Sequence, residues 1–311
     1  MKKHIFIVFI ILTAILLAAC QPAGQVPSAS QTINVVAVET FLADIAQNVA
    51  GDRFSVSSLI PLGSDPHSFE PTPQDVAVMS DADLLLINGR GFEEWLDPIT
   101  SSLPESVRII DCSAGLVART PNAGEASLLD PDHTQGDPHF WLDPISVIQY
   151  VNNIRDAFIA MDPQAEAEYR TNADAYIQQL RDLDAWIAAQ VAQIPLEDRY
   201  LVTNHESLGY FADQYGFQIV GAIIPSVSSG ASPSAQQVAD LVDRIEATGV
   251  RGIFLETGAN PQLAEQIAAE ANIQNITELF THSITAPEGL APSYIGMMQY
   301  NTTAIVNALK P

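Results

Sequence analysis

Short apolar runs alternate with helical stretches along most of the chain. Each run is almost continuously apolar and is bounded by turn residues, which is typical of parallel strands that are covered on both faces. Four runs precede the middle of the chain and four follow it, so the pattern predicts an α/β protein with two lobes, each built on a four-stranded parallel sheet. The runs are 33–39, 54–60, 83–89, 108–113, 199–206, 217–224, 252–256 and 275–280.

The longest helical pattern separates the two sets of strands. Apolar residues recur at steps of three and four from Tyr169 to Val191, as they do on one face of an α-helix. Pro163 suits a first helical turn and Pro195 ends the pattern, with no Gly or Pro between 164 and 194. We therefore expect a single long helix that joins the lobes, and a helical hairpin is the alternative. The predicted boundaries are 33–162 for the N-terminal α/β lobe, 163–195 for the linking helix and 196–311 for the C-terminal α/β lobe.

The start of the chain predicts a targeting segment. Two lysines precede an apolar run, 5–17, that is too short to cross a bilayer comfortably. The run ends in LAAC, which resembles the lipobox of bacterial lipoproteins and implies a lipidated Cys20; an ordinary secretory cleavage site is the alternative. We expect a lipoprotein signal peptide over 1–19 and a flexible tether over 20–32. The mature chain would then be extracytoplasmic, lipid-anchored to the cell membrane on its periplasmic or cell-surface side.

Charge and cysteine content narrow the classes of function. The chain has 13 basic and 37 acidic residues, for a net charge of −24 at pH 7, so we expect no nucleic-acid partner. Cys112 is the one cysteine besides Cys20, which excludes an internal disulfide and a thiolate metal cluster from the folded part. Its place in an apolar run indicates a small buried core residue.

Four of the six histidines follow predicted strands or lie in the loops beyond them. His67 and His139 come from the first lobe, and His205 and His282 from the second. Open α/β sheets bind ligands at the carboxyl ends of their strands, and neutral imidazole suits zinc, copper and nickel, whereas manganese prefers oxygen. The four therefore predict a transition-metal site in a crevice at such strand ends, against the alternative of solvated loop histidines. His133, in a polar loop, is predicted to be solvated.

The segments that carry these histidines resemble those of a known family. SDPHSFEPTPQD, DPHFWLDP, NHESLGYFADQYGF and PSYIGMMQYN are similar, in order and spacing, to the ligand loops and tail of the zinc- and manganese-binding lipoproteins of ABC importers. The resemblance covers about residues 33–310. It implies two lobes of similar topology joined by a long helix, one metal ion between them, and delivery of that ion to a membrane permease.

Residue by residue, the resemblance implies that His67, His139 and His205 are the first three ligands. Histidine at the third position goes with zinc binders in this family and glutamate with manganese binders. The chain departs from the family at the fourth position, where many members have aspartate in TDS and this chain has His282 in THS. We expect His282 to be the substituted ligand, with water or a nearby carboxylate as the alternative. Acids that could orient or replace ligands are Asp65, Glu70, Glu206 and Glu256; surface or capping acids are the alternative.

We therefore expect a solute-binding receptor that captures a divalent transition metal and delivers it to the membrane subunit of an ABC permease. We expect Zn²⁺ to be the transported ion, with Mn²⁺ less favoured. A manganese or iron receptor of the same family is therefore the first alternative. A surface-anchored zinc hydrolase is the second, but it needs an open coordination position and a placed base, which four protein ligands would not leave. We expect that the protein is not an enzyme and that it is a monomer.

Overall fold

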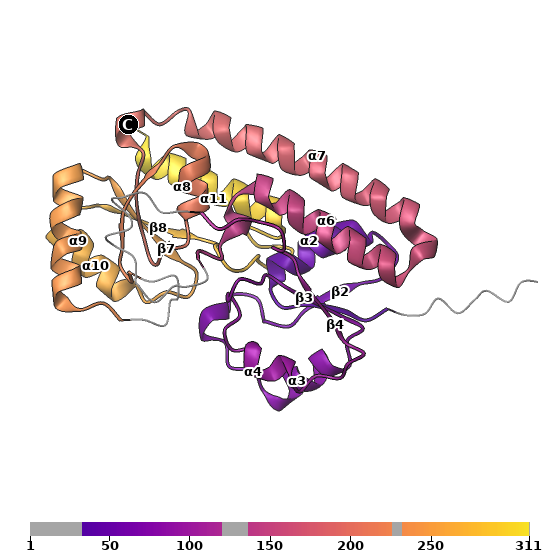
Figure 1. Ribbon diagram of the computed structural model, residues 1–311. Coiled ribbons are helices and arrows are strands. Elements are labelled where there is room, and N and C mark those ends of the chain that lie inside the picture. Colours follow the sequence, from indigo (N-terminus) through magenta and orange to yellow (C-terminus); the bar gives the residue numbers. More distant parts are fainter. Residues whose placement is uncertain (1–32, 120–135, 226–231, 311) are drawn as a thin grey trace, which may run out of the picture. The chain divides into compact units, whose positions relative to one another are not determined.

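The computed structural model describes residues 33–119, 136–225 and 232–310 (Figure 1). The predicted signal peptide, the tether with Cys20, and His133 lie outside the described residues. Within the described parts, no helix has the length and apolar character needed to cross a membrane.

The first sheet is formed by the four apolar runs of the N-terminal half. All its strands are parallel, in the order β2-β1-β3-β4. The two central strands, β1 and β3, are almost wholly buried because helices cover both faces, as their uninterrupted apolar residues predicted. The strands are β1 (Val35–Ala37), β2 (Val56–Ser58), β3 (Leu84–Ile87) and β4 (Arg108–Asp111).

The second sheet repeats the topology of the first. It is again four-stranded and parallel, in the order β6-β5-β7-β8, so the first strand of each lobe lies between the second and the third. The strands are β5 (Tyr200–Thr203), β6 (Gln218–Ala222), β7 (Gly252–Glu256) and β8 (Asn275–Leu279). The predicted α/β class, with two lobes and two four-stranded parallel sheets, is confirmed.

Shorter helices accompany the two sheets; most of them cover the outer faces, whereas α8 packs in the core beside the long helix that joins the lobes (Figure 1). In the first lobe, α3 contributes Met79 to a small apolar cluster with β1 and β3. In the second lobe, α9 and α10 pack on β6, β7 and β8 and bury Leu241 and Ile267. These helices are α3 (Pro73–Ser80), α4 (Asp97–Thr100), α8 (Gly209–Tyr215), α9 (Ala235–Thr248) and α10 (Pro261–Glu270).

The predicted long helix is present as α7 (Glu166–Val191), an unbroken helix of 26 residues that is about 39 Å long at 1.5 Å per residue. It begins later than Pro163, because Pro163–Ala165 forms a separate 3₁₀ turn that connects it to α6 (Pro144–Met161). The buried positions of α7 are the apolar residues that predicted it. The helix packs against α6, the C-terminal helix and α2 (Thr40–Ala50).

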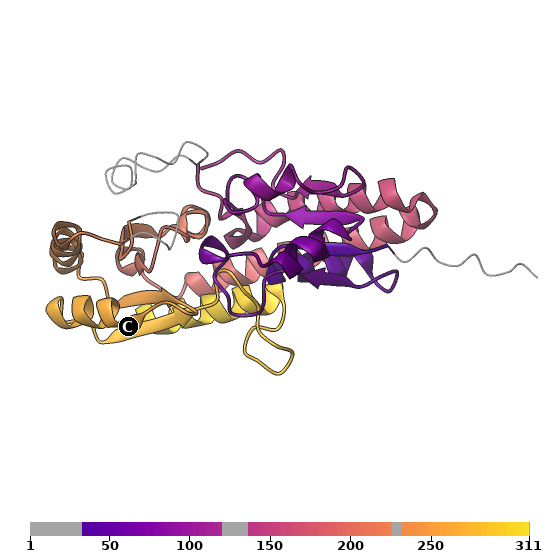
Figure 2. The same cartoon turned by 90° about the horizontal axis from the view of Figure 1, so that it is seen from below.

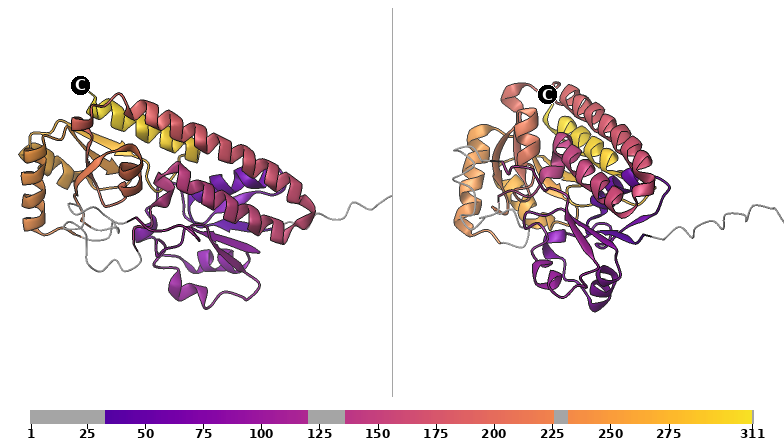
Figure 3. Two further views of the ribbon diagram at one scale, coloured as in Figure 1. Left: turned by 45° about the horizontal axis from the view of Figure 1, so that its top comes forward. Right: turned by 45° about the vertical axis from the view of Figure 1, so that its right-hand side comes forward.

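One hydrophobic core runs through both lobes. The C-terminal helix α11 (Tyr294–Leu309) packs on β8 of the second lobe and also on α7 and α2 (Figures 2 and 3). Its first residue, Tyr294, donates its backbone N–H to Asp44 at 2.9 Å and its hydroxyl to the Trp141 carbonyl at 2.6 Å, both in the first lobe. Inner-face residues of both sheets belong to this core, so the lobes are joined by packing as well as by α7.

A pair of buried glutamates lies in the first lobe, where β1 and β3 end. Glu39 is fully buried and neither of its carboxyl oxygens has a hydrogen-bond partner among the described residues. Glu93 accepts from the backbone N–H groups of Asn88 and Gly89. Burial, and then the neighbouring Glu93, raises the pKa of Glu39 well above its ordinary value. Burial also raises the pKa of Glu93 to about 7, although its hydrogen bonds oppose this. The pair therefore holds protons that free carboxyls would lose.

This pair predicts a stability that falls as the pH rises. Between the ordinary pKa of 4.5 and about 7, the folded protein binds more protons than the unfolded chain, so the free energy of unfolding decreases across that window. Glu39→Gln is neutral at every pH and should weaken this dependence. Between pH 5 and pH 8, the free energy of unfolding of the variant should rise by at least about 1 kcal/mol relative to that of the parent, since one pKa unit corresponds to about 1.4 kcal/mol.

The measurement is urea unfolding of parent and variant at both pH values. Glu94→Gln is the matched control, because Glu94 is the exposed neighbour of Glu93 and carries the same charge. Equal pH dependence in the parent and in Glu39→Gln would show that the buried pair does not titrate as described.

Candidate metal centre

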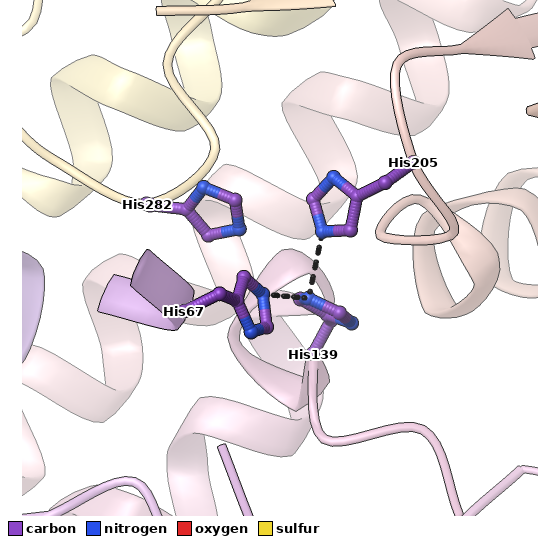
Figure 4. A group of neighbouring side chains, drawn as sticks. All are labelled: His67, His139, His205 and His282. Atoms are coloured by element: carbon purple, nitrogen blue, oxygen red, sulfur yellow. Dashed lines mark hydrogen bonds between the residues drawn. The ribbon is translucent and has the colours of Figure 1, made fainter. Parts of the chain in front are cut away.

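The four predicted histidines are held by four segments that are far apart in the sequence (Figure 4). His67 lies in the 3₁₀ turn η1 (Pro66–Ser68), and His139 directly precedes the turn η2 (Phe140–Leu142). His205 follows β5 after one intervening residue, and His282 comes three residues after β8. The last two are therefore placed by the strand ends of the second sheet, where a parallel sheet collects ligand-binding side chains.

The structure brings all four rings together. One nitrogen atom from each ring lies within 4.8 Å of the others. The Nε2 atom of His139 is 3.4 Å from Nε2 of His67 and 3.2 Å from Nε2 of His205 (Figure 4). His139 and His205 are fully buried, His282 is 7% exposed and His67 is partly buried. Nitrogen lone pairs that are brought together in a mostly buried space repel one another, and a cation bound among them would stabilise the arrangement.

His67 and His139 are presented by the same local device. Each follows an Asp-Pro pair, and the aspartate two residues earlier accepts a hydrogen bond from the histidine backbone N–H, at 2.9 Å for both Asp65 and Asp137. Such Asx turns, with proline fixing φ, hold the backbone before each ring. The repeated DPH tripeptide was the signal in the sequence that could have identified both aspartates as structural partners.

Asp137 also orients the ring of His139. Its Oδ1 lies 2.8 Å from Nδ1 of His139, which directs Nε2 to the centre of the cluster. Burial raises the pKa of Asp137 to about 7, opposed by the hydrogen bond from His139 and by the charge of Arg119. The Tyr210 hydroxyl donates to the Asp137 carbonyl at 2.7 Å and so ties this loop to α8. Asp137 was not among the residues predicted from the sequence.

Glu256, at the end of β7, has the corresponding place beside His205. Its Oε2 is 2.7 Å from Nδ1 of His205 and 3.8 Å from Nδ1 of His282, while Ser207 donates to its other oxygen at 2.8 Å. Glu256 was one of the acids predicted to orient ligands, and the structure places it against two of the histidines. Of the other acids predicted, Asp65 caps the turn of His67, Glu70 is exposed, and Glu206 follows His205 in the chain.

The four rings differ in their affinity for protons. Burial, and then the neighbouring histidines, hold the pKa of His67 well below its ordinary value. Burial also lowers the pKa of His282, with Glu256 opposing it. Burial disfavours the charge on His205 as well, but the charge and hydrogen bond of Glu256 raise its pKa overall. Burial alone would raise the pKa of Glu256, yet His205 and His282 bring it below its usual range. Glu256 therefore favours the protonated form of His205, whereas burial favours the neutral forms of His67 and His282.

The Nε2 atom of His282 is buried and has no hydrogen-bond partner among the described residues. An unpaired buried nitrogen costs free energy unless something else binds it. A cavity of about 330 Å³ lies beside the cluster, and Asp65, Glu256 and His282 contribute to its lining together with residues of the second lobe. The residues present thus fit a divalent cation: four nitrogens converge, one lacks a partner, and two carboxylates stand behind the rings.

Comparisons with known proteins agree with this geometry. The model of the family described as zinc-uptake complex component A, periplasmic (ZnuA), matches residues 35–308. The manganese-binding lipoprotein MntA of Halalkalibacterium halodurans is 32% identical over 310 residues, which cover 99% of each chain. The manganese ABC transporter substrate-binding lipoprotein PsaA of Streptococcus pneumoniae is 29% identical over 311 residues, with the same coverage.

Two solved structures are similar over nearly the whole described chain. The periplasmic zinc-binding protein TroA from Treponema pallidum has a TM-score of 0.80 and 27% identity, covering 90% of this chain and 100% of its own. A manganese-bound periplasmic metal-binding protein from Candidatus Liberibacter asiaticus has a TM-score of 0.78 and 27% identity, covering 89% of this chain and 100% of its own. The two-lobed fold is therefore shared with one protein described as zinc-binding and with another solved with manganese bound.

The contact between Glu256 and His205 predicts that His205 titrates differently from His67 and His282 in the metal-free protein. His205 should lose its proton above the ordinary histidine pKa of about 6.5, whereas His67 and His282 should lose theirs below it. In Glu256→Gln the burial of His205 is no longer opposed by an adjacent charge, so its pKa should fall. Imidazole NMR signals followed between pH 5 and pH 8 measure these values.

Glu70→Gln serves as the control, because it removes an exposed acid from the same region and should leave the titration of His205 unchanged. Two results would contradict this prediction: a parent protein in which His205 is already neutral at pH 6, or a Glu256→Gln variant in which the pKa of His205 is unchanged.

Proposed function

Because this chain belongs to the zinc-uptake component A family of solute-binding receptors, we propose that it captures a divalent transition metal ion outside the cytoplasm and delivers it to an ABC permease. The observation that carries the proposal is the convergence of four imidazole nitrogens within 4.8 Å. Each of the four comes from a different loop, and each lobe contributes two of them. Such a site binds one ion with protein ligands alone.

Zinc is the metal that this set of ligands favours. Zinc binds imidazole nitrogen readily and is almost always four-coordinate and tetrahedral in sites made wholly of protein ligands. The carboxylates of Asp137 and Glu256 lie 2.8 and 2.7 Å from Nδ1 of their histidines. Partners of this kind fix the tautomer, so that Nε2 is the free ligand, and make the ring more basic. We therefore propose His67, His139, His205 and His282 as the ligands of Zn²⁺.

Manganese is the second candidate, because the names of the relatives MntA and PsaA specify manganese. Mn²⁺ prefers oxygen ligands, and Glu256 is an oxygen donor that already lies 3.8 Å from His282 Nδ1. A manganese site here would need that carboxylate, or water, in place of an imidazole. The four-histidine cluster supports zinc over this arrangement.

Membership of the same family also supports a membrane anchor and a receptor, not an enzyme. The relatives are named lipoproteins, which supports acylation of Cys20 and an extracytoplasmic receptor held at the membrane. The family consists of receptors, not enzymes, and a shell closed by four protein ligands leaves no position for an activated water. The proposed monomer presents the site to the permease as a single binding unit.

The proposal predicts a single site that prefers Zn²⁺ to Mn²⁺. His282→Ala should lower the Zn²⁺ affinity more than about 100-fold, since losing a ligand exceeds the 10- to 100-fold cost of losing a partner behind a ligand. His282→Asp should narrow the difference between the two metals, because it supplies the oxygen that Mn²⁺ prefers. Competition calorimetry with Zn²⁺ and Mn²⁺ measures both effects.

His133→Ala is the matched control, since His133 was predicted to have no ligand role, and it should bind as the parent does. A parent that binds Mn²⁺ in preference to Zn²⁺ would replace the first candidate with the second. A parent that binds neither metal at a stoichiometry of one would overturn the proposal.

Metal affinity should also depend on pH in a specific way. The metal must displace the proton of His205, whose pKa is raised, while His67 and His282 remain neutral to lower pH. As the pH falls from 7.5 toward 5.5, affinity should therefore decrease, at first with the uptake of about one proton per ion released. Calorimetry in buffers of different ionisation enthalpy counts that proton. An affinity that is constant over this range would contradict binding by histidines.

A further inference from the structure

The loop that carries His282 is bonded to the opposite lobe. It follows β8 of the second lobe, yet the Thr281 carbonyl accepts from the indole N–H of Trp141 at 2.7 Å. The hydroxyl of Ser283 accepts from the backbone N–H of Gly63 at 2.9 Å and from the hydroxyl of Thr40 at 3.2 Å. Trp141, Gly63 and Thr40 all belong to the first lobe. Both chain neighbours of His282 are therefore fixed by first-lobe groups.

The hydroxyl groups of Ser283 and Thr40 form a closed network. Ser283 donates to the Ile284 carbonyl at 2.8 Å, and the Ile284 N–H donates to Thr40 Oγ1 at 3.1 Å. Ser283 is 5% exposed and Thr40 is 4% exposed. Buried polar groups whose hydrogen bonds are all satisfied rigidify their surroundings, and removing one partner leaves the others unpaired at a cost. The network therefore fixes the position of the loop, beyond adding stability.

His282 needs this support more than the other buried histidines do. His139 and His205 each have a carboxylate oxygen within 2.8 Å of Nδ1. Among the described residues, the contacts of His282 at Nδ1 are longer, 3.4 Å to the hydroxyl of Thr281 and 3.8 Å to Glu256. A ring without a close partner of its own takes its position from its backbone, and that backbone is held on either side by the first lobe.

We propose that Ser283, acting with Thr40, is a positioning residue that holds His282 against His67 and His139 across the lobe interface. The inference rests on the proposed metal-binding function and adds to it. His67, His139 and His282 are then one rigid three-histidine unit on the first lobe, and His205 is the ligand supplied by the body of the second lobe. Without the Ser283 hydroxyl, His282 would still be present but displaced from the fourth corner of the site.

The experiment compares hydroxyl deletions on the full mature protein. Ser283→Ala and Thr40→Val should each lower Zn²⁺ affinity about 10- to 100-fold, the range for partners behind metal ligands, with the stoichiometry unchanged. Thr40→Ser keeps the hydroxyl and should bind like the parent. The control is Thr302→Val, which removes a fully buried hydroxyl bonded to the Met298 carbonyl at 2.7 Å, in α11 and apart from this network.

A spectroscopic measurement separates positioning from general loss of structure. With Co²⁺ as the probe, the parent should show the intense visible absorption of a tetrahedral ion. Ser283→Ala and Thr40→Val should show a weaker spectrum, as water replaces the displaced ring, while Thr302→Val keeps the parent spectrum even if its melting temperature falls equally. This readout would not change if Ser283 contributed only to stability.

The outcomes distinguish the two proposals. If the parent binds neither Zn²⁺ nor Co²⁺ at one site, the proposed function itself fails. If the parent binds, but Ser283→Ala and Thr40→Val match Thr302→Val in affinity and Co²⁺ spectrum, the positioning role is wrong. If Ser283→Ala does not fold, the comparison of Thr40→Val with Thr40→Ser decides, because only the former lacks the hydroxyl.

Discussion

The site requires four imidazole rings to lie within a few ångströms of one another while most of them stay uncharged. Two protonated rings at that distance in a buried space would repel strongly. Burial favours the neutral forms of His67 and His282 by lowering their pKa values, whereas Glu256 raises the pKa of His205. The rings are thus ready for a cation before one arrives, which reduces the free-energy cost of ordering them on binding.

This arrangement depends on a frame that holds both lobes in fixed positions. The long helix α7 alone would be a single connection, but α11 and α2 pack against it in the same core. Hydrogen bonds from Tyr294 to Asp44 and Trp141 cross between the lobes next to the loop of His282. A shared core of this kind resists a wide hinge motion, because opening it would expose apolar surface. Ion capture and release are then expected to involve loop and ring movements more than separation of the lobes.

Much of the fold, and the identity of the four clustered histidines, followed from local sequence patterns. Continuous apolar runs identified the strands, and the rule that ligands collect at strand ends brought His205 and His282 together. The start of α7 at Glu166, the role of α11 and the partners of Ser283 did not follow, because they depend on contacts between distant segments. Thr40 and Ser283 are 243 residues apart, and no periodicity reports such a pair. Asp137 could have been predicted from the sequence, since its DPH tripeptide repeats the one that contains His67.

The two carboxylates behind the rings bear on the choice of ion through charge balance. A divalent cation held by four neutral imidazoles keeps its full charge of +2 in a buried site, which is costly unless anions lie nearby. Asp137 and Glu256 supply one negative charge each when ionised, at the outer nitrogens of His139 and His205. The bound ion would favour ionisation of Asp137, whose pKa of about 7 in its absence reflects burial. In the proposed zinc site these two carboxylates would offset part of the charge of the ion from behind the rings, although Arg119, 4.0 Å from Asp137, opposes them. No carboxylate would then need to enter the all-nitrogen shell, which zinc accepts and manganese disfavours.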